Sequence, residues 1–227
     1  METTTVERPL ITATKLATAN LDDWRTVTEA LRDTPALETQ QGWLTTPQDG
    51  FAPTRVRTGW TNAGLVVWGE LDDADIFNPV TTFNEPTFRH GDAFEIFLRP
   101  GNQEVYFEFH ISPENQLFQL RIPSANHFAM QRLRGGVNIE ALKIKQPVIH
   151  SRVKVDRAAG RWSVLALVPF QVVIESKLPP PAGPWLASFS RYDYTRGRHK
   201  PIVSSTSPHV RADFHRQQEW GELRFGE

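Results

Sequence analysis

Alternation of apolar and polar positions is the dominant pattern of the chain after residue 53. A period of two sends successive side chains to opposite faces, which is typical of β-strands. The alternating segments predict strands over residues 54–60, 65–71, 92–98, 105–111, 117–122, 148–155, 161–168, 185–192 and 222–225. Short turns such as Pro113-Glu114-Asn115 join several of these segments, so we expect neighbouring strands to run antiparallel.

A helical period occurs near the N-terminus. The positions that follow it are Leu21, Trp24, Thr28 and Leu31. Asn20 stands directly before them, where its side chain can cap the first turn of a helix. The pattern predicts one helix near residues 21–33, within an N-terminal extension of residues 1–53 that packs on the main domain.

Many short strands and one helix predict an all-β protein, which we expect to be an antiparallel β-sandwich of the jelly-roll or immunoglobulin-like kind. Residues 54–227 are expected to form this sandwich as one domain. No regular element is predicted over residues 1–20, 35–53, 72–91 and 123–147. The proline-rich residues 179–184 are interpreted as a stiff connector embedded in the domain.

Composition excludes several classes of protein. The 227-residue chain has no cysteine, which rules out disulfides, cysteine-ligated zinc and thiol nucleophiles. Lys and Arg number 25 against 26 Asp and Glu, a balance that argues against nucleic-acid binding through phosphates. No apolar run of about 18 residues occurs, so no membrane-spanning helix is expected. The lack of a signal peptide predicts a cytoplasmic protein, with a processed secreted protein as the alternative.

Two acidic residues on neighbouring predicted strands are candidates for catalysis. Glycosidases place a pair of carboxylates on either side of the bond they cleave, and Glu95 and Glu108 could form such a pair. This requires a strand register that brings both to one face, and sequence does not fix register. Otherwise they are exposed acids on a solvated face of the sheet.

Two further groups of polar residues are candidates for metal binding. The first supplies hard oxygen ligands from one loop, as calcium prefers: Asp72, Asp73, Asp75 and Asn78. The second combines a carboxylate with imidazoles: Asp213, His215 and His209. The alternative for the first group is a solvated loop. The alternative for the second is a His/Asp pair that bonds a neighbouring loop.

The order of sequence motifs along the chain resembles that of a known protein family. Two strands lead into Asp72-Asp73-Ala74-Asp75, and Gly91-Asp92-Ala93-Phe94-Glu95-Ile96-Phe97-Leu98 follows. Later segments read Arg161-Trp162-Ser163-Val164-Leu165 and Gly183-Pro184-Trp185-Leu186-Ala187, and the last begins Asp213-Phe214-His215. Over residues 54–225 this series resembles the family-nine carbohydrate-binding modules and their DOMON-like relatives. The resemblance implies an antiparallel β-sandwich that binds sugars without catalysis and is often fused to glycan-degrading enzymes.

The resemblance also implies positions for the sugar site. Glu95 matches a glutamate that binds sugar hydroxyls, and His110 falls near a basic contact that is arginine in the family. The two stacking tryptophans are absent: Phe88-Arg89-His90 stands at the first position and residues 203–208 at the second. We therefore expect Phe88, Arg89 and Tyr192 to complete the site. No cofactor is expected apart from the structural calcium that the resemblance implies.

The main hypothesis is a non-catalytic domain that binds a mono- or oligosaccharide, linked to glycan degradation. The first alternative is a structural or interaction domain that kept the fold and lost the sugar site. The second is a glycan-active enzyme that uses Glu95 and Glu108. A haem-binding relative is a further option, in which Met130 would have to be an axial ligand because it is the single methionine after Met1.

Overall fold

The structure is a computed structural model, and it describes residues 7–101, 103–174 and 185–227. The described residues are mostly β. The strands are β1 (Leu10–Lys15), β2 (Leu37–Glu38), β3 (Thr54–Thr61), β4 (Gly64–Asp72), β5 (Ala93–Arg99), β6 (Tyr106–Ile111), β7 (Leu117–Ile122), β8 (His150–Asp156), β9 (Arg161–Pro169), β10 (Trp185–Asp193), β11 (Ile202–Ser205) and β12 (Gly221–Phe225). All nine strands predicted from the alternation are confirmed, with ends that shift by a residue or two.

The helices are fewer and shorter. They are α1 (Trp24–Arg32), α2 (Ala125–Leu133), α3 (Ile139–Leu142) and α4 (Phe170–Val173), with 3-10 turns η1 (Thr87–Arg89) and η2 (Gln217–Glu219). The helix predicted near residues 21–33 is confirmed as α1. The expectation of a single helix is wrong, because α2 and α3 occupy residues for which the pattern predicted no element.

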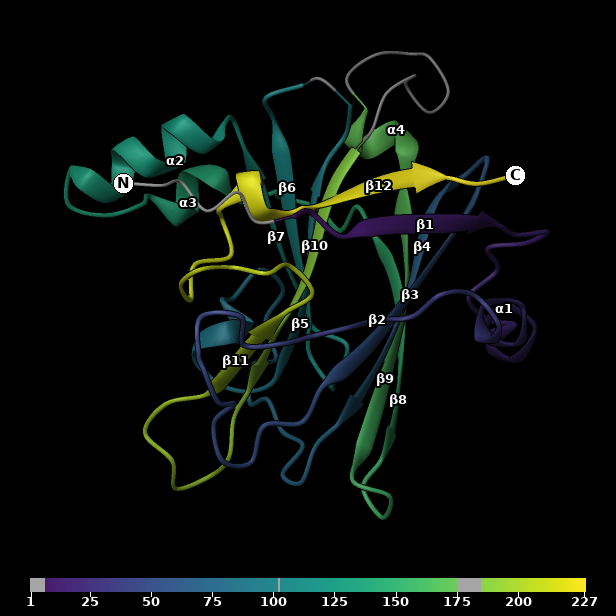
Figure 1. Cartoon of the computed structure of the whole chain (residues 1–227), viewed down its shortest axis with the longest axis horizontal. Coiled ribbons are helices and arrows are strands. Elements are labelled where there is room, and N and C mark those ends of the chain that lie inside the picture. The colour runs from purple at the N-terminus through teal and green to yellow at the C-terminus, as the bar shows by residue number, and fades with distance from the viewer. Residues whose placement is uncertain (1–6, 102, 175–184) are drawn as a thin grey trace.

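The strands form one mixed sheet in the order β7-β6-β5-β10-β12-β1-β3-β4-β9-β8, with β11 beside β10 and β2 beside β3. The paired strands are antiparallel except β1, which runs parallel to both β12 and β3. Figure 1 shows β1 and β12 side by side across the molecule. The prediction of a fully antiparallel sheet is therefore wrong at β1. Its short run of Leu, Ile, Thr, Ala and Lys carries too little apolar alternation to be recognised.

The sheet curls so that its two halves share one hydrophobic core. The first half holds β7, β6, β5, β10 and β12, and the second holds β3, β4, β9 and β8. Phe94 and Ile96 of β5 belong to the same buried cluster as Val164 and Ala166 of β9. The coarse prediction of a β-rich, sandwich-like protein is confirmed by this arrangement. The division of the chain at residue 54 stays a prediction, and β1 contributes a central strand to the sheet.

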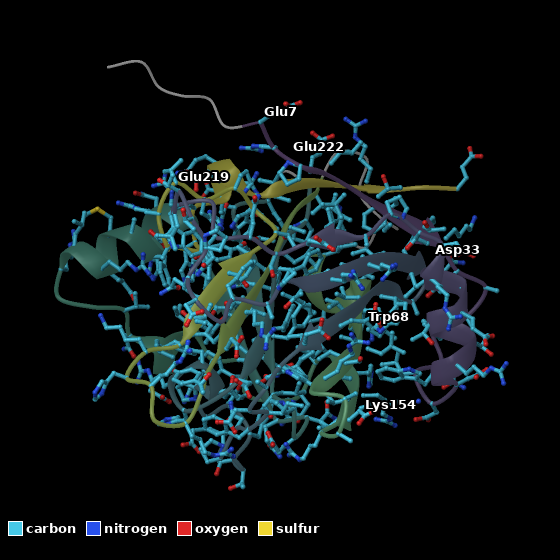
Figure 2. The ribbon with its side chains drawn as sticks, turned by 60° about the horizontal axis from the view of Figure 1, so that its bottom comes forward. Glu7, Asp33, Trp68, Lys154, Glu219 and Glu222 are labelled. Atoms are coloured by element: carbon cyan, nitrogen blue, oxygen red, sulfur yellow. The ribbon has the colours of Figure 1, made fainter. Side chains whose placement is uncertain are left out.

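Each half has a second face, which points away from the shared core. On the second half, Val27 and Leu31 of α1 pack against Val66 and Trp68 of β4. Figure 2 labels Trp68 and also Asp33, the residue that follows α1. This face is therefore covered by the helix rather than exposed to solvent.

The outer face of the first half is covered by the segment that contains α2 and α3. Ser124 caps α2 by accepting a hydrogen bond from the His127 N–H at 3.0 Å. Phe128 of α2 and Leu142 of α3 are buried in a cluster with Phe97 of β5. Side chains that alternate away from the core on β5 and β6 thus enter a second enclosed space. The proline-rich residues 179–184 lie outside the described residues, as does the start of the chain.

Candidate ligand-binding cavity

A cavity of about 330 Å³ lies on the outer face of the first half, between β5, β6, β10 and α2. Aromatic rings supply much of its wall: Phe88, Phe97, Phe128, Tyr192 and Phe214. Ionisable groups supply the rest of the chemistry: Arg89, Glu95, Glu108, Arg132, Asp213 and His215. An apolar cavity with a few convergent polar groups is the usual form of a small-molecule site.

Phe88 is positioned by side chains that form hydrogen bonds to the backbone of the turn η1. The Tyr194 hydroxyl donates to the carbonyl of Phe88 at 2.8 Å, and the Asn78 amide donates to the carbonyl of Thr87 at 3.1 Å. The Phe88 ring lies 5.5 Å from the ring of Tyr192, at 54° to it. These contacts fix two aromatic faces at the cavity before any ligand arrives.

Three buried ionisable side chains form the polar floor. Glu95 on β5 is paired across the sheet with His110 on β6, and Glu108 lies two residues before His110 on the same face. His110 Nδ1 lies 3.1 Å from Glu95 Oε1, and His110 Nε2 lies 2.5 Å from Glu108 Oε1. The exposed fractions are 2% for Glu95, 5% for Glu108 and 1% for His110. The alternative in which the two glutamates are exposed acids is therefore wrong.

Burial and mutual contact shift the protonation of this floor. Burial raises the pKa of Glu95 to about 8, opposed by the charge of His110. Burial alone would raise the pKa of Glu108 too, but the hydrogen bond with His110 and the positive charges of His215, His110 and Arg132 together outweigh it and lower this pKa. For His110, burial favours the neutral ring, and the two carboxylates overcome that effect and raise its pKa. At neutral pH the cluster therefore holds protons that exposed groups would have released.

Two carboxylate oxygens of the floor have no hydrogen-bond partner among the described residues. They are Glu95 Oε2 and Glu108 Oε2, and both glutamates line the cavity. The contact of His110 Nδ1 with Glu95 also lacks hydrogen-bond geometry. Buried polar atoms are nearly always paired. These two oxygens and His110 Nδ1 are therefore positioned to interact with a ligand, an ion or a proton.

The far side of the cavity is built from α2 and the C-terminal segment. Arg132 Nη1 donates to Asp213 Oδ1 at 2.9 Å, and the Phe128 ring stacks on His215 with 3.7 Å between ring centres. His215 Nδ1 lies 2.9 Å from the Tyr106 hydroxyl, while burial lowers the pKa of His215 to about 4. A largely neutral imidazole therefore lies between α2 and the floor.

The structure brings together four of the five site residues named from the sequence. Phe88, Arg89, Glu95 and Tyr192 line the cavity. His110 contacts the two glutamates of the floor without lining the cavity itself, and its ring centre lies 5.3 Å from that of Phe88. Sequence reasoning missed the part of the wall supplied by α2. Ser124 before a run of helix-compatible residues, closed by Gly135-Gly136, was the available indication of that helix.

His209 and His215, which the sequence grouped with Asp213 as possible metal ligands, contact different partners. His209 Nδ1 lies 2.9 Å from Glu219 Oε2, whereas His215 contacts Tyr106. Asp213 Oδ1 accepts a hydrogen bond from the His215 N–H at 3.4 Å. Within the part of the chain that the structure describes, these three residues do not form a metal-ligand cluster.

The acidic loop after β4 is engaged with arginines. Asp72 pairs with Arg161 at 2.6 Å, and Asp75 pairs with Arg196. Asp73 pairs with Arg191 at 3.1 Å, and that guanidinium also contacts Asp193 at 3.2 Å. A calcium ion in this loop would have to displace these guanidinium groups. Structural calcium here stays a prediction.

Comparison with solved structures gives matches over nearly the whole chain at low identity. A protein from Bacteroides uniformis ATCC 8492, described as a candidate carbohydrate-binding protein, aligns with a TM-score of 0.68 and 13% identity, covering 97% of this chain and 100% of that one. A family 9 carbohydrate-binding module from Caldicellulosiruptor kristjanssonii in complex with cellotriose aligns with a TM-score of 0.58 and 11% identity, covering 96% and 93%. The fold resembles that of family 9 carbohydrate-binding modules.

A family 9 module from the same organism in complex with glucose gives a TM-score of 0.61 at 10% identity, covering 95% of each chain. The resemblance inferred from the order of motifs is thus confirmed at the level of the fold. No protein-family model matches the sequence, and no curated protein matches it.

The positions that the resemblance assigns to the two stacking tryptophans of family 9 modules both reach the cavity. Phe88 comes from the first of these positions, and Val203 of β11 comes from the second. One aromatic ring and one aliphatic side chain thus stand where the resemblance implies two indole rings. Among the described residues no helix is long and apolar enough to cross a membrane.

Proposed function

We propose that this chain binds a carbohydrate, as a free sugar or as the end of an oligosaccharide, in the cavity between Phe88, Tyr192 and Glu95. The observation that carries the proposal is the position of the unpartnered Glu95 Oε2 and Glu108 Oε2 beside aromatic walls. Sugar rings present C–H groups that pack on aromatic faces and hydroxyls that donate to carboxylates. A cavity of about 330 Å³ is of a size that suits a small ligand.

The neighbouring structures support this proposal through their own ligands. The two family 9 modules were solved with cellotriose and with glucose. Because the present chain shares about a tenth of its residues with them, its sugar cannot be carried over from theirs. We infer a role in recognising glycans, linked to their degradation, and a sandwich of the jelly-roll kind, antiparallel except at β1, as the framework for that role.

We also propose that the binding is non-catalytic. A retaining glycosidase holds its two carboxyl groups about 5–5.5 Å apart with the scissile bond between them. Here the imidazole of His110 lies between Glu95 and Glu108 and contacts both carboxylates. The space that a glycosidic bond would need is thus filled by a side chain, which favours a binding site over an enzyme.

Titration calorimetry against glucose, cellobiose, cellotriose and a broader glycan panel tests the proposal, with EDTA in every buffer. We expect binding of at least one sugar and a loss of about tenfold in affinity for Phe88→Ala and for Tyr192→Ala, because each removes a stacking face. Tyr192→Phe keeps the ring and serves as the matched control, with near-unchanged affinity. Lack of binding to the whole panel at millimolar sugar would contradict the proposal, as would full affinity in both alanine variants.

A further inference from the structure

The floor of the cavity has the donor set of a metal site. Glu95, Glu108 and His110 can each offer one ligand atom, and these atoms all lie within 4.8 Å of one another. They come from adjacent antiparallel strands, so the hydrogen-bonded ladder between β5 and β6 fixes their spacing. Ligands on strands of a sheet are held more rigidly than ligands on loops.

Each of the three side chains also carries an atom without a hydrogen-bond partner in the part of the chain that the structure describes. Glu95 Oε2, Glu108 Oε2 and His110 Nδ1 are buried and make no hydrogen bond within the described residues. Both glutamates are more than nine-tenths buried and line the cavity. A buried carboxylate oxygen without a partner is costly, and an ion would remove that cost.

We propose that Glu95, Glu108 and His110 bind a divalent transition-metal cation, and that Zn²⁺ matches the site best. Zinc takes imidazole and carboxylate ligands and commonly binds three protein groups with a fourth position open. Calcium fits less well, because it takes six to eight oxygens and this floor supplies only two carboxylates. Once bound, the ion would replace the protons that the cluster holds at neutral pH, and two carboxylates with a neutral imidazole would balance the charge of one divalent ion.

The surroundings of the three side chains support this assignment. The ring of His110 packs against Phe88 at 5.3 Å and against the edge of Phe118 at 5.0 Å, which fixes its orientation. His215 Nε2 lies 3.6 Å from Glu108 Oε2, and His215 is itself held by Tyr106. Such outer contacts orient metal ligands in known sites. The open position would face the cavity, because both glutamates line it.

The inference goes beyond carbohydrate binding and does not rest on it. A metal ion on this floor could serve any ligand that carries a hydroxyl or carboxylate oxygen. The two proposals fail separately, because the sugar titrations contain EDTA and the metal titrations contain no sugar.

The test is calorimetric titration of Zn²⁺ into protein dialysed first against EDTA and then against chelator-free buffer. We expect one equivalent of Zn²⁺ per chain, and at least tenfold weaker binding for Glu95→Gln and His110→Gln. His209→Gln is the matched control, because it alters another buried imidazole that contacts a glutamate, and it should bind as the unmodified protein does. Absence of binding would overturn the proposal, as would unchanged binding in both Glu95→Gln and His110→Gln.

A second measurement uses the unmodified chain and needs no variant to fold. Addition of Co²⁺ should give visible absorption bands typical of nitrogen and oxygen ligands, and Zn²⁺ should bleach them at one equivalent. Circular dichroism of the variants shows which of them are folded. Cobalt that gives only the spectrum of the hydrated ion would overturn the proposal. Binding of Ca²⁺ in place of Zn²⁺ would also contradict it.

Discussion

The Nη2 atom of Arg191 lies 3.1 Å from Asp73 Oδ2, and both side chains are only 1% exposed. The same nitrogen lies 3.2 Å from Asp193 Oδ2, and Arg191 Nη1 donates to the carbonyl of Asp72 at 2.7 Å. Asp92 lies close by, with its carboxylate within 4.8 Å of those of Asp73 and Asp193. A single guanidinium thus faces three buried carboxyl groups.

Replacement of Arg191 by methionine should be strongly destabilising. It keeps most of the side-chain length but leaves buried acids without their cation, a change that typically costs about 3–5 kcal/mol. Urea unfolding of Arg191→Met measures this, and the loss should shrink at low pH, where the acids take up protons. Arg161→Met is the control, because its partner Asp72 and Arg161 itself are both half exposed and the loss should be at most about 1 kcal/mol. Equal losses in the two variants would contradict the role given to Arg191.

Protonation of Asp193 should make the free energy of unfolding depend on pH. Burial raises its pKa from 3.8 to about 6, with Arg191 opposing the shift and Asp73 adding to it. The folded state thus holds this proton more tightly than the unfolded chain does. The stabilisation from Asp193 is complete below about pH 3.8 and is lost as pH rises through 6, by up to about 3 kcal/mol.

Asp193→Asn lacks this proton, so the unfolding free energy of the native chain relative to the variant should fall between pH 4 and pH 7. Urea unfolding at intervals across that range measures the difference. Asp156→Asn, at the exposed last residue of β8, is the matched control for the loss of one carboxylate. A level difference for Asp193→Asn would show that folding leaves this pKa unshifted, and a rising one that folding lowers it; either would contradict the prediction.

Glu95→Gln should weaken carbohydrate binding, with EDTA present so that metal has no part in the result. With its pKa raised to about 8, Glu95 is mostly a neutral carboxyl group near pH 7. A hydrogen bond between it and a sugar hydroxyl is worth about 0.5–1.5 kcal/mol, which is about 2- to 12-fold in affinity. Glu85→Gln changes a partly exposed acid in the loop that carries Phe88, outside the cavity wall, and should leave affinity unchanged. Equal affinity of the Glu95 and Glu85 variants would remove Glu95 from the site.

Phe128→Ala should destabilise the cover of the cavity. Phe128 is the buried residue of α2, and its ring stacks on His215 and lies 5.0 Å from the Arg132 guanidinium. Loss of a buried phenylalanine costs about 3–5 kcal/mol when the chain cannot close the gap. Hydrogen exchange should accelerate across α2. Leu133→Ala, on the same helix and 80% exposed, should change stability by less than about 0.5 kcal/mol. Protection of α2 that is unchanged in Phe128→Ala would show that the helix is held in another way.

The strands could be predicted because one face of each meets a core, and that leaves a period of two in the sequence. The same pattern misled at Glu95 and Glu108, where the polar positions suggested a solvated face. That face is closed by α2 and α3, and no local pattern of β5 or β6 records what covers them. The pairing of Glu95 with His110 likewise depends on strand register, which the sequence leaves open.

The candidate site was predicted in part for a related reason. Phe88, Glu95 and Tyr192 stand in or beside segments whose order resembles a known family, so their positions could be inferred. Arg132 and Phe128 come from a helix with a single buried side chain, and one apolar residue gives no period to detect. The place of such residues in the site is therefore visible only in the folded structure.

The parallel pairing of β1 with β12 and β3 bears on how the chain reaches its native state. Leu10 pairs with Glu222, so residues from opposite ends of the sequence must meet before the two halves become one sheet. Bringing such distant residues together costs the chain conformational entropy before the favourable contacts form, and this makes folding slow. During synthesis on the ribosome, the edge of β1 that pairs with β12 therefore stays unpaired until β12 has been synthesised.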